Sequence, residues 1–483
     1  MTHAFFISND WRAFNMLFKQ PYQKAEHLAP MINVGAGLDI ITGRWYYGQH
    51  GEALLNGGHA QLSGYVGGGN LYKTTSMLYK NLRAMYRIHP ESTGSIYETE
   101  MNTQGTRIGD LASQLPEFDG NDPIETERFI VTSRKQYSGD EWYDATKEFL
   151  EQKVELGKKK EYRAKLPFMK LGTNELMDMI IPTFGGLDSF SDFVTKDVSK
   201  MNDDVGLGEK GAETMFMKQG IQKLRLLSEY PPLLHKAAHY FSMSAQVGPI
   251  FNLDQYNPEK KKLSNIQGNV KMKGVTDKFT YIMNSILQFY NLEKLIHRQT
   301  KLPQFPRDEF DKAEGDSDLN VLHAIELRGK SGPSGVPIRL IVSQKQGVLA
   351  SMTEFYNLWD HPDSFGLEGN DQNYFLTLRP DAKLSRTKVR SKIDTDPMLQ
   401  RALTITMELM QMTRLMPELR NQGLLCTPKE LFDGVKEKGY DWDEILGNTR
   451  GWWTLNNDDH PVPFLSTLDL MRMRIDKYKP YWK

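Results

Sequence analysis

Short apolar runs alternate with longer helical patterns through the middle of the chain, between about residues 60 and 345. The strand-like runs are HAQLSGYVG (59–67), GSIYETEM (94–101), IIPTFGGLDSF (180–190) and AAHYFSMSAQ (237–246). Helical spacing of apolar residues is found in TSMLYKNLRAMYRI (75–88) and GAETMFMKQGIQKLRLLSEY (211–230). Strands that alternate with helices predict an α/β domain with a largely parallel central sheet.

Three other segments have a different pattern. Residues 119–170 are highly charged and predict an inserted helical arm, whereas residues 249–274 have no steady period and predict a long loop. The run LNVLHAIELRGK-SGPSG-VPIRLIVSQ (319–344) predicts two strands joined by a turn, which is a hairpin. These patterns divide the chain into an N-terminal segment (1–50), a core (51–345) and a mostly helical C-terminal domain (346–483), whose TRGWWT turn suits a winged-helix-like fold.

Composition indicates an ordinary globular protein. Hydrophobic residues make up 39% of the chain and charged residues 25%, with a formal net charge of −1. The chain is therefore not a polycation, and any nucleic-acid contact must come from local basic loops. It contains no apolar run of membrane-spanning length, its N-terminus lacks the features of a signal peptide, and Cys426 is the only cysteine. We therefore predict a cytoplasmic protein without a membrane partner.

The stretch VGGGNLYKTTSM (66–77) nearly matches the phosphate-binding loop G-x-x-x-x-G-K-[ST] and lies between a predicted strand and a predicted helix. Tyr72, however, stands where the pattern has glycine. In such a loop backbone N–H groups face phosphate, Lys73 adds positive charge and the Thr74 hydroxyl binds Mg²⁺. The alternative is a glycine-rich turn without a ligand. The candidate cofactor-binding residues are Gly67, Gly68, Gly69, Asn70, Leu71, Tyr72, Lys73, Thr74 and Thr75.

Polar residues follow the next strand-like runs. In YETEMN (97–102), Glu98 and Glu100 are separated by one residue at the end of a strand-like run, where a carboxylate could face a nucleotide and orient water against its γ-phosphate. The run ending in Asp188-Ser189 matches the position of a Mg²⁺-binding aspartate in NTP hydrolases, and Gln246 ends the run that leads into a lysine-containing loop. Polar strand ends and ordinary turns are the alternative interpretation of each motif.

Basic residues gather in the predicted long loop. Lys260, Lys261, Lys262, Lys271 and Lys273 lie there, with Phe251 and Tyr256 close by in the sequence. Lysines with interleaved aromatic rings suit phosphate contact and base stacking by single-stranded nucleic acid. A solvated run of charges is the alternative.

The order of these motifs resembles the RecA/UvsX family of ATP-dependent recombinases, and in particular its phage UvsX branch. APMINVGAG (29–37) is similar to the P-M-x-N-[IV]-A stretch that precedes the P-loop there, and that branch also has an aromatic residue at the position of Tyr72. YETEMN and LDSFSDF (187–193) resemble the two acidic motifs of the family. Gly185-Gly186 replace its usual bulky residues, the segment 119–170 is larger than the family needs, and the part after about residue 346 has no match.

The resemblance implies a RecA-like ATPase core that uses ATP and Mg²⁺. Lys73 would bind phosphate, Thr74 and Asp188 would bind the metal, Glu100 would orient the attacking water, and Gln246 would couple ATP to a DNA loop. Arg328 and Lys330 resemble a cationic pair that reaches the ATP of the next subunit. The DNA loops would be about 194–212 and 249–274. The implied DNA-binding residues are Lys196, Lys200, Lys210, Phe251, Lys260, Lys261, Lys262, Gly268, Asn269, Lys271 and Lys273.

The predicted function is therefore that of an ATP-dependent DNA recombinase that forms helical filaments on single-stranded DNA and exchanges strands with double-stranded DNA. The N-terminal segment would serve oligomerisation, and a single-strand-binding protein and a mediator are possible further partners. If the protein is encoded by a phage, its location would be the host cytoplasm. Two alternatives stay open: a hexameric helicase of RecA fold, and a non-catalytic RecA-like filament protein.

Overall fold

The computed structural model describes residues 29–101, 103–169, 175–199, 212–250, 263–314, 318–361 and 365–482. The strands are β1 (Trp45–Tyr47), β2 (Ala53–Leu55), β3 (Leu62–Gly67), β4 (Thr93–Glu98), β5 (Phe129–Ser133), β6 (Arg163–Met169), β7 (Leu176–Ile180), β8 (Thr183–Asp188), β9 (His239–Pro249), β10 (Val270–Met272), β11 (Ser285–Lys294), β12 (Leu319–Gly329), β13 (Pro337–Ser343), β14 (Gly347–Val348), β15 (Leu367–Asn370) and β16 (Asn373–Leu376). The helices are α1 (Lys73–Ile88), α2 (Gly105–Ser113), α3 (Gly139–Leu156), α5 (Ala212–Lys236), α6 (Asp277–Ile282), α7 (Glu309–Glu314), α8 (Ala350–Trp359), α9 (Val389–Thr395), α10 (Pro397–Leu415), α11 (Glu418–Asn421), α12 (Pro428–Glu437), α13 (Trp442–Asn448) and α14 (Thr467–Arg474).

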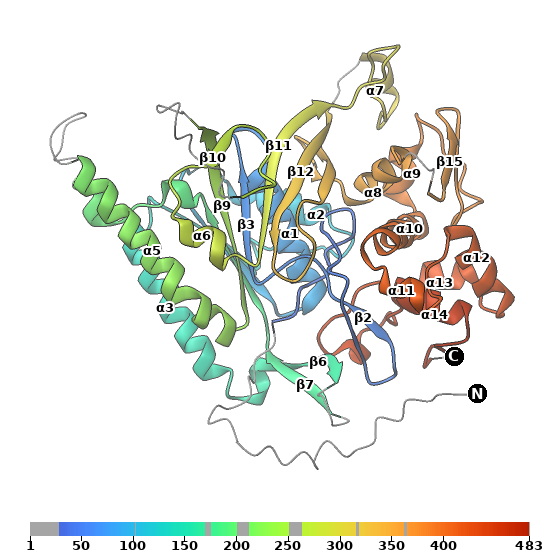
Figure 1. Cartoon of the computed structure of the whole chain (residues 1–483), viewed down its shortest axis with the longest axis horizontal. Helices are drawn as coiled ribbons and strands as arrows, with labels where there is room; N and C mark the ends of the chain where they lie inside the picture. Colours follow the sequence, from blue (N-terminus) through green and yellow to red (C-terminus); the bar gives the residue numbers. More distant parts are fainter. Residues whose placement is uncertain are drawn as a thin grey trace.

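One large sheet forms the centre of the molecule (Figure 1). Its strand order is β14-β13-β12-β11-β3-β9-β8-β4-β5, and β10 pairs with the far end of β9. The strands from β11 to β5 are parallel, whereas β12, β13 and β14 continue the sheet in antiparallel fashion. The prediction of a mixed α/β protein with a largely parallel sheet is confirmed, and so is the hairpin, which consists of β12 and β13.

Helices cover both faces of the parallel part of the sheet. Alternate residues of β3 point to opposite faces, so Tyr65 packs with α1 and α2, whereas Val66 packs with α3 and α5. The long helices α3 and α5 lie side by side along one flank (Figure 1). Helix α5 continues through Pro231 and Pro232, beyond the end of the predicted helix. The core is thus a three-layer arrangement with α1 held directly behind the strand that leads into it.

The segment 119–170 is not the single helical arm that its charge predicted. It contains β5, which forms the parallel edge of the central sheet beside β4, then α3, and then the start of a small hairpin with β7. The strand β5 was hidden in the sequence because it is an edge strand of which only Phe129 is buried. The predicted loop 249–274 also contains a strand, β10. Residues 1–28 of the N-terminal segment, to which oligomerisation was assigned, lie outside the described residues.

The C-terminal part packs against the antiparallel end of the sheet (Figure 1). Its helices α8, α10, α12, α13 and α14 share one hydrophobic core with residues of β12 and β13. The predicted helical character is therefore present, together with one small hairpin, β15–β16. The TRGWWT turn forms no hairpin, since Arg450 makes only an isolated bridge to Phe464. Among the described helices, none has the length and apolar character needed to cross a bilayer.

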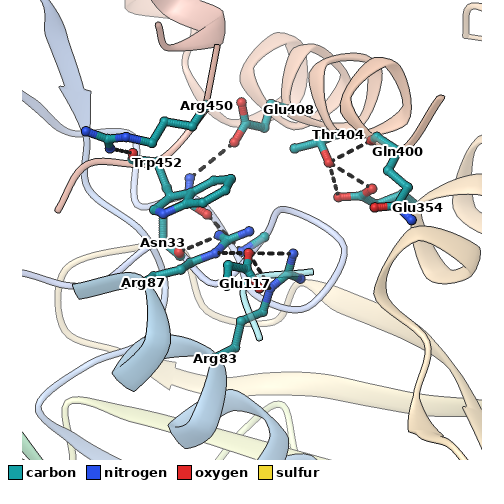
Figure 2. A network of polar contacts seen from close by, with 11 residues as sticks. Asn33, Arg83, Arg87, Glu117, Glu354, Gln400, Thr404, Glu408, Arg450 and Trp452 are labelled. Carbon is teal, nitrogen blue, oxygen red and sulfur yellow. Dashed lines mark hydrogen bonds and ion pairs between the residues drawn. The ribbon is translucent and has the colours of Figure 1, made fainter. Parts of the chain in front are cut away.

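A buried polar network connects the far end of α1 to Asn33 and to the C-terminal part (Figure 2). Arg83 and Arg87 of α1 bind the carboxylate of Glu117, at 3.3 Å and 2.7 Å. Arg87 also donates to the carbonyl of Asn33 at 2.7 Å, and the Asn33 amide donates to Glu408 of α10 at 3.2 Å. Burial alone would raise the pKa of Glu117, but the two guanidinium groups hold it at about 2. The helix that begins at the glycine-rich loop is therefore immobilised at its other end.

Candidate nucleotide site

The candidate residues meet where four parallel strands end at the same edge of the sheet. β3 leads into the glycine-rich loop, β4 ends at Glu98, and β8 ends at Asp188. β9 lies between β3 and β8, so Gln246 is level with Gly67 on one side of it. The carboxyl edge of parallel strands is where ligands of open α/β sheets bind, because side chains and helix N-termini converge there.

The glycine-rich loop turns without the glycine that Tyr72 replaces. Asn70 and Tyr72 both adopt left-handed backbone conformations, with φ of 58° and 50°. Tyr72 is the residue immediately before α1, and its ring packs on the core formed by α1 and the sheet. Position 67 has no room for a side chain, because a Cβ there would lie 2.7 Å from the carbonyl oxygen of Phe289. A Cβ on Gly69, in contrast, would meet no atom within 4 Å.

Lys73 is the first residue of α1, and its ammonium group lies inside the curve of the loop. The Nζ atom donates to the carbonyl of Gly68 at 2.6 Å. Burial lowers the pKa of Lys73, while the carboxylates of Asp188 and Glu100 oppose this shift. A positive side chain thus stands beside the helix N-terminus, and both favour an anion.

Thr74 and Asp188 are in direct contact, although they are far apart in the sequence. The Thr74 hydroxyl donates to Oδ2 of Asp188, and the hydroxyl of Ser244 on β9 donates to Oδ1. Asp188 is 7% exposed and Ser244 is fully buried. The peptide bond between Asp188 and Ser189 is cis. A hydroxyl and a carboxylate side by side are the oxygen ligands that Mg²⁺ prefers.

Glu100 and Gln246 form a second contact at the same edge. The Gln246 amide donates to Glu100 at 3.1 Å and to Asp192 at 3.2 Å. Glu100 is exposed, whereas Glu98 is buried and accepts a hydrogen bond from Thr103. Of the two glutamates, Glu100 is therefore the one that faces outward beside Lys73.

Gln246 is tied to the strand that carries the predicted lysines. Its backbone carbonyl accepts from the backbone N–H of Lys273 at 2.8 Å, and its N–H donates to the hydroxyl of Ser191 at 2.8 Å. Ser191 in turn donates to the carbonyl of Lys273 at 2.8 Å. Lys223 of α5 donates to the carbonyls of Ser191 and Gly274, and burial lowers its pKa to about 8. Gln246 is therefore linked through hydrogen bonds to the residue that follows β10.

The predicted DNA-binding residues are only partly placed. Lys271 and Lys273 are exposed on and next to β10, and Gly268 and Asn269 form the turn before it, with φ of 80° at Gly268. Lys196 is engaged with α3: its backbone N–H donates to Asp140, and its ammonium group lies 3.8 Å from Glu141. The others lie outside the described residues: Lys200, Lys210, Phe251, Lys260, Lys261 and Lys262.

Arg328 and Lys330 do not join the site within one chain. Arg328 on β12 pairs with Ile286 on β11, and Ile286 is level with Gly64, three residues before the start of the loop. The pair is thus displaced from the loop by about 10 Å along the strands and about 10 Å across them. The Lys330 ammonium group donates to the carbonyl of Ile282 at 2.8 Å.

The donor set fits a nucleotide phosphate with its magnesium ion. Lys73 and the N-terminus of α1 would hold phosphate oxygens, and Thr74 with Asp188 would hold the metal. No cluster of three or more His, Cys, Asp or Glu side chains with metal-binding geometry occurs among the described residues. Such a cluster is unnecessary here, because phosphates and waters complete the coordination of Mg²⁺ in sites of this kind.

Sequence reasoning missed Ser191, Lys223 and Ser244. The only trace of Ser244 in the sequence is its spacing, since Ser242, Ser244 and Gln246 occupy alternate positions and so share one face of β9. Ser191 and Lys223 act through backbone carbonyls, which no side-chain motif records.

Comparison with known proteins gives little further guidance. No protein-family model matches the sequence, and no curated protein matches it. Among solved structures, the crystal structure of the RadB recombinase is similar to 60% of this chain and 92% of that chain, with 14% sequence identity and a TM-score of 0.31. A TM-score of this size is too low to carry an argument about fold or activity.

Proposed function

We propose that the chain is a Mg²⁺-dependent ATPase with a RecA-like core. The observation that supports this most strongly is the contact between Thr74 and Asp188, directly beside Lys73 at the end of the loop strand. If the glycine-rich turn bound no ligand, there would be no reason for the buried Asp188 carboxylate to contact the hydroxyl of Thr74, the residue after the loop lysine. The insertion of β9 between β3 and β8 brings a third polar residue, Gln246, to the same place.

In the proposed mechanism each residue has one task. Lys73 and the backbone N–H groups at the start of α1 bind the phosphates, and Thr74 and Asp188 hold the metal. Bound Mg²⁺ supplies neutralisation of the negative charge on the β- and γ-phosphates. Glu100 orients the attacking water, because it is the exposed carboxylate beside Lys73. Gln246 positions Glu100 through a hydrogen bond and connects it to the residue that follows β10.

The finer proposal is a DNA recombinase similar to the UvsX branch. It rests on the sequence resemblance, on the link from Gln246 to Lys273, and on the exposed Lys271 and Lys273 on and next to β10. Arg328 and Lys330 would act on the nucleotide of an adjacent copy, which agrees with their displacement from the loop of their own chain. Single-stranded DNA would bind near β10, mainly through its phosphates, so sequence specificity would be low.

The test is ATP hydrolysis by the native protein and by Lys73→Ala, with and without single-stranded DNA. Native protein should hydrolyse ATP faster with DNA, and Lys73→Ala should lose hydrolysis under both conditions. Lys236→Ala, which removes an exposed lysine at the end of α5, is the matched control. Equal hydrolysis by Lys73→Ala and native protein would contradict the proposal. Imaging of the assembly on DNA then separates helical filaments from helicase-like rings.

A further inference from the structure

Both oxygens of the Asp188 carboxylate are held by hydroxyl groups from different elements. Thr74 on α1 contacts Oδ2 and Ser244 on β9 contacts Oδ1. Only Thr74 belongs to the loop motif. Ser244 lies in the middle of a central strand and has no exposed surface.

The face of β9 that carries Ser244 is polar at alternate positions. Ser242 donates to the side chain of Asn81 on α1 at 2.9 Å, Ser244 donates to Asp188, and Gln246 donates to Glu100. Each polar group on this face therefore has a different partner. Ser242 and Ser244 are both buried hydroxyls on the same strand face, but only Ser244 touches a site carboxylate.

We propose that Ser244 is the positioning residue for the magnesium-binding carboxylate. This inference rests on the proposed function. The χ2 torsion of an aspartate is broad, so a carboxylate at a strand end can rotate among several orientations. A hydrogen bond from the rigid centre of β9 to Oδ1 selects the orientation in which Oδ2 faces the Thr74 hydroxyl. The metal then meets two oxygens that are already placed, and no ordering of Asp188 is needed when it binds.

The role predicts a specific defect in Ser244→Ala. Partners that orient a metal ligand typically change metal affinity 10–100-fold when removed. We expect the Mg²⁺ concentration that gives half-maximal binding of a fluorescent ATP analogue to rise about 10–100-fold. Binding of the same analogue in EDTA should change less than about twofold, because Lys73 and the loop backbone are untouched.

Ser242→Ala is the matched control. It removes a buried hydroxyl from the same strand face, so it reproduces the loss of folding stability caused by removing such a group without touching Asp188. Its Mg²⁺ midpoint should equal that of the native protein, and the urea unfolding midpoints of both variants should fall by similar amounts. Ser244→Ala with a native Mg²⁺ midpoint, or an equal shift in Ser242→Ala, overturns the positioning role. Native protein that binds no nucleotide in the presence of Mg²⁺ overturns the proposed function, and the inference with it.

Discussion

Glu326 provides a sharp test of the buried electrostatics next to the proposed trans-acting pair. It lies on β12 two residues before Arg328, is 5% exposed, and accepts hydrogen bonds from the Ser285 hydroxyl at 2.9 Å and from the backbone N–H of Ile286 at 3.3 Å. Burial raises its pKa to about 8, with a further contribution from Asp39, while the nearby Lys80 opposes the shift. Glu326 is therefore protonated in the folded protein at neutral pH.

The magnitude follows from the difference between the folded and unfolded pKa. The unfolded value is 4.5 and the folded value is about 8, so unfolding at intermediate pH releases a proton. Native stability thus falls as pH rises from 4.5 to 8, by about 1.4 kcal/mol per pH unit from this residue alone. Glu326→Gln keeps an acceptor for Ser285 and cannot ionise. Its free energy of unfolding relative to the native protein should therefore increase by about 3 kcal/mol between pH 5 and pH 7.

Urea denaturation of the native protein and of Glu326→Gln at pH 5, 6, 7 and 8 measures this difference. Taking the difference between the two proteins cancels the titration of groups that they share. Glu368→Gln, which removes an exposed carboxyl group on the hairpin β15–β16, is the control variant. A difference between Glu326→Gln and native protein that stays constant from pH 5 to pH 8 would refute the buried, protonated state of Glu326.

Four further substitutions test the loop and the network behind it. Gly67→Ala should destabilise the protein and abolish nucleotide binding, because its Cβ would lie 2.7 Å from a backbone oxygen of β11. Gly69→Ala should leave the thermal unfolding midpoint unchanged, and equal thermal midpoints of the two variants would contradict the loop geometry. Tyr72→Gly should keep nucleotide binding, measured by titration, because glycine adopts a φ of 50° more easily than tyrosine. Loss of binding would mean that the tyrosine ring itself contacts the ligand. Glu117→Gln should lower the free energy of unfolding, measured by urea denaturation, by about 3–5 kcal/mol, because two buried guanidinium groups lose their carboxylate partner. A change below about 1 kcal/mol would show that water replaces the lost carboxylate as their hydrogen-bond partner.

The site residues were predictable where they follow strands. Asp188 and Gln246 lie at the ends of apolar runs, and Lys73 follows the loop that leaves the end of β3; parallel strands bring such ends to one edge. The pairing of Thr74 with Asp188 follows from that topology. The choice between Glu98 and Glu100 does not, because it depends on where β4 stops, and the strand ends at Glu98 with its side chain buried.

Other features depend on tertiary contacts that leave no local pattern. Strand β5 is stabilised by its pairing with β4, although its own sequence buries only Phe129. The left-handed conformation of Tyr72 is an exception to the local preference for glycine and is supported by the packing of its ring. The network around Glu117 joins Asn33, α1 and α10, which only the folded chain brings together.

The most direct test of the nucleotide site is calorimetric titration of ATP into the native protein and into Asp188→Asn, each with Mg²⁺ and with EDTA. Asp188→Asn keeps the size of the side chain and removes the charge that would bind the metal. Native protein should bind ATP more tightly with Mg²⁺ than with EDTA, and Asp188→Asn should bind equally under both conditions. Absence of ATP binding by the native protein, or an unchanged Mg²⁺ effect in Asp188→Asn, would contradict the assignment.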